Sequence, residues 1–131
     1  MVLGIGIDLV SILRLEQAVG RWGLRFLERI YTPAELGFCM GRSNEKAALA
    51  ARFAAKEACS KALGTGMRHG VSWRQMEVVH DPSGRPVLRL GGYTAEHAKI
   101  MGAEKFHLSL THEAEYAGAV VVIEGSIVTK L

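Results

Sequence analysis

A long helix over residues 45–63 is the feature that most constrains how this chain can fold. The stretch Glu45–Leu63 is rich in alanine and contains no internal glycine or proline, so it predicts a continuous helix. Gly64 follows directly, and glycine is the residue type most favoured just after a helix end. The sequence therefore predicts one long helix near the middle of the chain.

The residues on either side of this helix predict an α+β order: one strand, then helices, then mostly strands. The elements predicted before it are a strand at 2–10, a helix at 11–19 with Ser11 as N-cap, an apolar segment interrupted by Gly20 and Gly23, and a helix that starts at Thr32-Pro33-Ala34-Glu35 and ends near Gly41. Those predicted after it are a hairpin of strands at 76–80 and 86–90 around a turn at 81–84, a helix at 93–101, adjacent strands at 106–110 and 116–124, and a tail at 125–131.

Length and composition set the class of protein. With 131 residues, 49% of them hydrophobic, and a net charge of +3, the chain suits one domain over residues 1–131 and not a disordered segment. Its two cysteines lack CxxC spacing, which predicts reduced thiols in a cytoplasmic protein. The apolar N-terminus carries Asp8 and no basic region, and the apolar run at 117–123 is far below the ~20 residues of a membrane helix. We therefore expect neither a signal peptide nor a membrane partner.

The first strand combines glycines with a carboxylate. Strand alternation places Gly4, Gly6, Asp8 and Val10 on one face, and Leu3, Ile5, Ile7 and Leu9 on the other. The nearly bare glycine face beside Asp8 allows either a tight packing contact or the close approach of a ligand, and both interpretations stay open here.

The long helix and the loop after it carry a second group. Glu57 and Lys61 are four residues apart on a stripe that continues from apolar positions, so they form either a surface ion pair or a site at the edge of the buried face. In Gly64-Thr65-Gly66, backbone N–H groups either complete the helix end or face an anion. The segment is not a Walker A loop, because Lys61 precedes the glycines.

Two further groups are polar or basic. His107, Ser109 and Thr111 share one face of a strand, and His112 falls where that strand should end. Two histidines five residues apart do not share a strand face, so a zinc pair is not expected. A basic set precedes the long helix and predicts either a solvated face or a docking surface for an acidic protein; it comprises Arg14, Arg21, Arg25 and Arg29.

Three of these segments together resemble the holo-acyl-carrier-protein synthases, the small 4′-phosphopantetheinyl transferases. Residues 4–10 resemble the opening strand of that family, residues 52–66 its most specific signature, and residues 107–113 with Tyr116 its third motif. The motifs occur in the family's order and cover nearly the whole chain. The resemblance implies the 4′-phosphopantetheinyl transferase fold, an antiparallel sheet packed against a long helix in a single domain.

The resemblance also implies an activity. The family transfers the 4′-phosphopantetheine arm of coenzyme A, its substrate, to a serine of apo-acyl carrier protein and releases adenosine 3′,5′-bisphosphate. Asp8 and Glu57 match its two ligands for Mg²⁺, with Mn²⁺ as the alternative ion, and oxygen ligands suit such an ion. Glu57 is also the candidate general base, directly or through a water. Lys61 matches a phosphate contact, and His112 either a phosphate contact or an acid–base group.

Binding residues follow from the same match. The implied CoA contacts are Lys61, Gly64, Thr65, Gly66, Gly84, Arg85, Pro86, Ser109, Thr111 and His112. Arg14 matches a family position in the helix that docks the acidic carrier protein, and Arg21 and Arg25 fall in the same region, with Phe26 as an apolar contact among them. Two positions depart from the pattern. Val10 stands where larger relatives carry a third carboxylate, so water and diphosphate oxygens are expected to complete the metal shell. Thr111 stands where serine is frequent.

Family members of this length form homotrimers with CoA at each subunit interface. The resemblance therefore implies that one subunit supplies Asp8, Glu57 and Lys61, while its neighbour closes over the CoA.

Three other functions fit the sequence less well. A non-catalytic CoA- or nucleotide-binding module of the same fold would be expected to lack Asp8 or Glu57. A nucleic-acid binder would need clustered aromatics or a strong basic stripe, and the aromatics here are scattered. An actin-like ATPase, suggested by Gly4–Asp8, needs a far longer chain.

Overall fold

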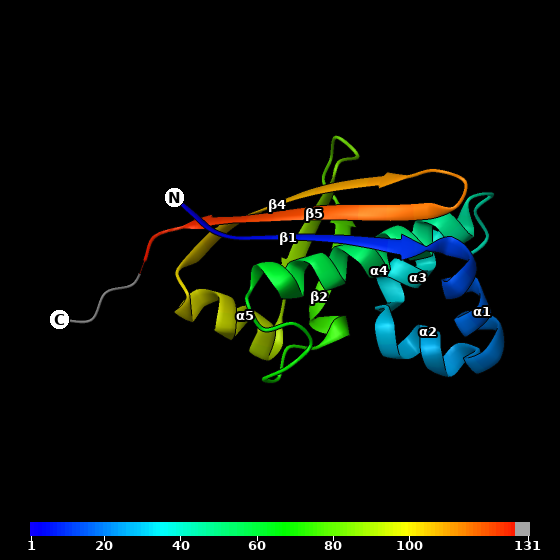
Figure 1. Ribbon diagram of the computed structural model, residues 1–131, viewed down its shortest axis with the longest axis horizontal. Helices are drawn as coiled ribbons and strands as arrows, with labels where there is room; N and C mark the ends of the chain where they lie inside the picture. Colours follow the sequence, from blue (N-terminus) through cyan, green and yellow to red (C-terminus); the bar gives the residue numbers. More distant parts are fainter. Residues whose placement is uncertain (128–131) are drawn as a thin grey trace.

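A three-stranded antiparallel sheet with one long helix across its face forms the frame of the molecule (Figure 1). The computed structural model describes residues 1–127, so the predicted tail at 125–131 lies partly outside the described residues. The strands are β1 (Val2–Ser11), β5 (Tyr116–Gly125) and β4 (Ala103–His112), paired in the order β1-β5-β4. Helix α4 (Glu45–Ala62) packs on one face, as predicted.

The remaining elements lie at the two ends of this frame and across its middle (Figure 1). One end carries α1 (Ile12–Trp22), α2 (Leu24–Ile30) and α3 (Pro33–Cys39). Toward the other end lies α5 (Gly92–Ile100), and between the two ends lie a short 3-10 turn (Trp73–Gln75) and the hairpin of β2 (Met76–His80) and β3 (Pro86–Leu90). Strand β3 contacts β4, so the hairpin extends past that edge of the sheet. The α+β class and the packing of the sheet on α4 are therefore confirmed.

The glycines of β1 allow the strand to pack closely against α4. A Cβ atom built on Gly6 would lie 1.8 Å from the carbonyl oxygen of Ala58, and one on Gly4 would lie 2.0 Å from that of Ala62. Only glycine lets β1 approach the α4 backbone this closely. Of the two interpretations left open for this face, the tight packing contact is correct at the glycines, and it brings Asp8 beside α4.

The opposite face of the sheet exposes apolar side chains. Ile5, Ile7 and Leu9 are 68%, 67% and 68% exposed, because α4 covers the glycine side of the strand. Register places Ile5 beside Val122 and Ile7 beside Val120 on the same outer face. A single chain therefore leaves a row of apolar residues uncovered on its sheet.

Helix boundaries follow local capping chemistry. Ser11 caps α1 by accepting from the backbone N–H of Arg14 at 3.2 Å. The predicted interruption at Gly20 is wrong: α1 continues to Trp22, since one exposed glycine costs a helix only about 1 kcal/mol. Thr32 and Glu35 form the predicted capping box of α3, which ends at Cys39 with Met40 as C-cap, next to Gly41 as predicted. Within residues 1–127, no helix is both long and apolar enough to cross a membrane.

Candidate functional site

A cleft between β1, α1 and α4 contains both predicted metal ligands. It has a volume of about 390 Å³, and its lining includes Asp8, Glu57, Arg14, Phe26 and Phe53. Asp8 reaches it from the helix-facing side of β1, immediately beyond the glycine contact that brings β1 against α4. Two carboxylates that lie far apart in the sequence thus line the same cleft.

Lys61 lies beside Asp8 in the same site. Its ammonium group donates to Oδ1 of Asp8 at 3.1 Å and to the carbonyl oxygen of Ile7 at 3.0 Å. The surface ion pair between Glu57 and Lys61, left open by their spacing, is not formed within residues 1–127. The structure therefore brings together three of the predicted site residues, Asp8, Glu57 and Lys61.

Glu57 lies in this cleft without an ion-pair partner within residues 1–127. Burial raises the pKa of its carboxyl above the ordinary value, the nearby Asp8 carboxylate raises it further, and Lys61 opposes both.

No group of three or more His, Cys, Asp or Glu side chains is gathered as a metal site in residues 1–127. Two carboxylates suit an ion such as Mg²⁺, which keeps several water ligands and takes one or two from protein. The residues present therefore fit the predicted ion.

The glycine loop after α4 completes the helix end. The backbone N–H groups of Thr65 and Gly66 both donate to the carbonyl oxygen of Ser60, at 3.3 and 3.1 Å. That of Gly64 donates to the carbonyl oxygen of Lys61 at 3.0 Å, and Gly64 adopts a positive φ of 81°. These three N–H groups donate to carbonyl oxygens within the turn, so they do not form a preformed anion-binding site.

Ser109 and Thr111 lie on the outer face of the sheet. Register places Ser109 in a row with Val120 and the exposed Ile7, whereas Asp8 faces α4. His112 ends β4, as predicted, and is exposed. Strand alternation puts it on the same face as Asp8. The third motif is therefore split between the two faces of the sheet.

A second groove, of about 370 Å³, lies where β3 meets β4. It brings the predicted residues Arg85, Pro86 and Ser109 together. The adjacent turn contains Gly84, with a φ of 88°, and is held by the Asp81 carboxylate, which accepts from the backbone N–H of Arg85 at 3.0 Å. Arg85, Pro86 and Ser109 therefore lie at the β4 edge of the sheet, whereas Lys61 contacts β1, the strand at the other edge.

The predicted docking residues also fall into two groups, one in the Asp8 cleft and one in a groove beside it. Arg14 and Phe26 line the Asp8 cleft, while Arg25 and Phe26 line an adjoining groove of about 470 Å³ with Trp22 and Arg29. The guanidinium of Arg21 lies 5.3 Å from the ring centre of Trp22. Sequence reasoning missed Trp22, which is 61% exposed. The available signal was a large aromatic residue directly after Arg21 and three residues before Arg25.

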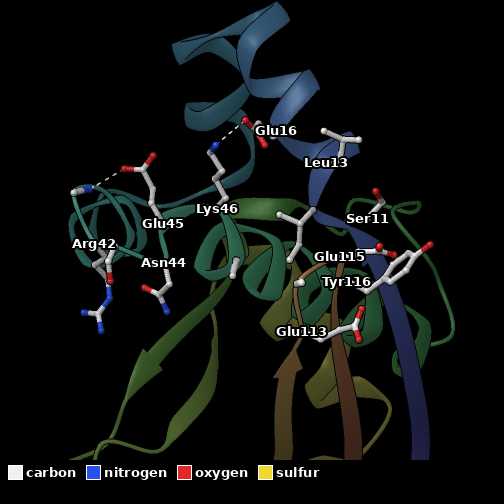
Figure 2. Close-up of a pocket in the computed structure, with 15 residues that line it drawn as sticks. Ser11, Leu13, Glu16, Arg42, Asn44, Glu45, Lys46, Glu113, Glu115 and Tyr116 are labelled. Atoms are coloured by element: carbon white, nitrogen blue, oxygen red, sulfur yellow. Dashed lines mark hydrogen bonds and ion pairs between the residues drawn. The ribbon is translucent and has the colours of Figure 1, made fainter.

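A further cleft, of about 980 Å³, is larger than the Asp8 cleft and both grooves (Figure 2). Figure 2 shows Glu113, Glu115 and Tyr116 from the β4–β5 turn facing the start of α1. On its other side, the Lys46 ammonium is paired with Glu16 at 2.7 Å. None of the predicted catalytic residues lines this cleft. Its size therefore does not identify the site.

Comparisons with known proteins agree with the arrangement. A family model described as the 4′-phosphopantetheinyl transferase superfamily matches residues 4–121. The holo-[acyl-carrier-protein] synthase of Koribacter versatilis is 49% identical, over 95% of this chain and 99% of the relative. One from Methylorubrum extorquens is 50% identical, over 98% of each.

Solved structures extend the comparison to the fold. The enzyme from Neisseria meningitidis superposes with a TM-score of 0.88 at 38% identity, covering 95% of this chain and 99% of the other. That from Helicobacter pylori, solved in complex with coenzyme A, gives 0.81 at 35% identity, covering 92% and 99%. With the family model, near-full-length relatives and the fold in agreement, this chain belongs to the holo-[acyl-carrier-protein] synthases of the 4′-phosphopantetheinyl transferase superfamily.

Proposed function

We propose that this chain, as one domain over residues 1–131, transfers the 4′-phosphopantetheine arm of coenzyme A to a serine of an apo-acyl carrier protein. The second product is adenosine 3′,5′-bisphosphate. One observation carries the proposal: in a chain of this family, Asp8 and Glu57 share a cleft in which Lys61 lies against Asp8. A non-catalytic CoA- or nucleotide-binding module would not need both carboxylates there.

The two carboxylates would hold the metal ion. Asp8 and Glu57 would bind Mg²⁺, with Mn²⁺ as the alternative, and the ion would neutralise charge on the CoA diphosphate. Glu57 accepts the proton of the attacking serine, directly or through a water. Lys61 steadies the phosphate that leaves, and exposed His112 contacts a phosphate or moves a proton.

CoA is bound between two subunits in this proposal. The contacts at the β1 edge are Lys61, Gly64, Thr65 and Gly66, those at the β4 edge are Gly84, Arg85, Pro86, Ser109 and Thr111, and His112 ends β4. Two groups at opposite edges of one sheet serve one ligand when the β1 edge of one copy meets the β4 edge of another. Such a contact joins unlike surfaces, and with a threefold rotation between copies it closes into a ring, the homotrimer of this proposal. The exposed apolar row of Ile5, Ile7 and Leu9 supports this arrangement, because burial in the ring would cover it.

The acidic carrier protein docks on α1 and α2. Arg14 lies in the catalytic cleft, and Arg21, Arg25 and Phe26 extend from it toward exposed Trp22. Fixed positive charge here would speed the encounter with an acidic partner. We place the reaction in the cytoplasm, where the buried thiols of Cys39 and Cys59 stay reduced.

Mass spectrometry tests the function directly. Apo-acyl carrier protein incubated with CoA, Mg²⁺ and this chain should gain about 340 Da, the mass of the arm. A carrier with its acceptor serine replaced by alanine is the control. Failure of the intact carrier to gain this mass in Mg²⁺ or Mn²⁺ would reject the proposed transfer.

A further inference from the structure

Lys56, the residue immediately before Glu57, is fully buried. Its ammonium donates to Oε1 of Glu35 at 2.7 Å and to the carbonyl oxygens of Met76 at 2.6 Å and Trp73 at 3.0 Å. The ring centre of Tyr31 lies 5.9 Å from the same nitrogen. All three protons of the ammonium therefore have acceptors, and these come from three segments outside α4.

Its partner Glu35 is just as fully bound. Oε1 also accepts from the backbone N–H of Thr32 at 2.9 Å, and Oε2 accepts from that of Val78 at 2.9 Å. Both side chains of the pair are 0% exposed. The pair thus connects the middle of α4 to the start of α3 and to β2.

An ion pair in this position is not explained by stability alone. Removing two charges from water costs a large part of what their attraction returns, so apolar replacements for such pairs are often neutral or stabilising. A buried ammonium with three directed acceptors does something that an apolar side chain cannot: it fixes the rotation of the helix that carries it.

That rotation determines where Glu57 lies. Consecutive residues of a helix point about 100° apart, so fixing Lys56 toward α3 and β2 sets the direction of Glu57. On the β1 side, the close approach of Gly6 to Ala58 fixes the distance between the strand and the helix. Helix α4 is held from both sides at the residues that flank Glu57.

We propose that Lys56 and Glu35 are positioning residues, which hold α4 in the rotation that presents the Glu57 carboxylate beside Asp8. The inference rests on the proposed function, because it concerns the geometry of that metal site. Neither residue touches substrate or metal; each acts through α4.

The test separates positioning from stability with a double variant. Lys56→Met alone leaves Glu35 buried without its partner and should lower the melting temperature. Lys56→Met/Glu35→Gln removes both charges and should recover most of that loss. We expect the double variant to bind Mn²⁺ roughly tenfold more weakly, measured by electron paramagnetic resonance without carrier, and to show kcat lowered roughly tenfold with the KM for carrier unchanged.

The matched control is Lys46→Met/Glu16→Gln, which removes an exposed Lys–Glu pair between α4 and α1 and should leave Mn²⁺ affinity and kcat unchanged. A folded double variant at Lys56 and Glu35 with wild-type Mn²⁺ affinity and kcat would overturn the proposal. If Lys56→Met/Glu35→Gln does not fold, Lys56→Gln/Glu35→Gln, which keeps amide donors for the carbonyl oxygens, is judged by the same two measurements. Absence of transfer by the wild type would reject the proposed function instead, while the Mn²⁺ measurement still tests positioning.

Discussion

The Lys61 ammonium lies 3.1 Å from Oδ1 of Asp8 and ties the last turns of α4 to β1. Glu57, one turn earlier on the same helix, has no ion-pair partner within residues 1–127. The two carboxylates of the cleft therefore differ before any metal binds. Asp8 is paired with a cation, whereas the Glu57 carboxylate, the proposed base, is not.

Neutral replacements of either carboxylate should abolish the reaction without unfolding the chain. Asp8→Asn and Glu57→Gln keep side-chain size while removing charge, so we expect each to lower Mg²⁺-dependent transfer by about 10²-fold or more. Glu16→Gln is the control, since Glu16 pairs with Lys46 outside this cleft. The rate of carrier modification checks the prediction, with circular dichroism to confirm folding. Near-normal turnover by either variant would remove that carboxylate from the site.

Glu57 should also make the metal-free protein less stable at neutral pH. Because burial and Asp8 raise the pKa of Glu57 in the folded state, its contribution to stability is present below its ordinary pKa and is lost as the pH rises through the folded pKa. Glu57→Gln cannot ionise. In EDTA at pH 7 it should therefore melt at a higher temperature than the wild type, and the difference should vanish near about pH 4. Equal melting temperatures at both pH values would contradict the raised pKa.

Two glycines that look alike in the sequence should respond in opposite ways to alanine. Gly6→Ala places a Cβ atom 1.8 Å from the Ala58 carbonyl oxygen, so we expect a loss of about 1–3 kcal/mol in the free energy of unfolding. Gly20→Ala lies in α1 with no atom within 4 Å of the new Cβ, and should gain about 0.5–1 kcal/mol. Urea unfolding measures both. A tolerated Gly6→Ala would mean that β1 and α4 can separate without penalty.

The sequence predicted local elements well because their signals are local. The capping box at Thr32 and Glu35, the hairpin strands, and the Gly64 helix end each depend on a few neighbouring residues. It could not determine which face of β1 is covered, because alternation alone does not say where α4 packs. The apolar face of Ile5 and Ile7 is exposed, and the glycine face is the one in contact.

Reversing the charge of Arg14 should weaken the carrier interaction specifically. Arg14 is exposed and lines the Asp8 cleft next to Phe26, so Arg14→Glu places a negative charge where an acidic carrier approaches. We expect the KM for carrier to rise about tenfold and the KM for CoA to change little, with the effect reduced at high salt. Lys99→Glu, an exposed reversal on α5, is the control. Equal rises in both KM values would contradict docking at this position.

The site itself was only partly predictable from the sequence. The motifs identified Asp8, Glu57 and Lys61, which one chain does bring together. Ser109 and Arg85 lie instead at the other edge of the sheet, in a separate groove. No local pattern could reveal this separation, because it depends on the strand order β1-β5-β4.

The separation of Asp8 and Arg85 at opposite edges of the sheet allows a direct test of whether each site is shared between two subunits of the proposed trimer. Asp8→Asn damages the β1-edge half of each site, and Arg85→Glu damages the β4-edge half. If each site combines halves from two subunits, an equal mixture of the two inactive chains, refolded together, should regain activity at about one quarter of its sites, those with two intact halves. Transfer is measured against each variant refolded alone. Activity no higher than that of the separate variants would mean that CoA is bound within one subunit, and the proposed interface would be wrong.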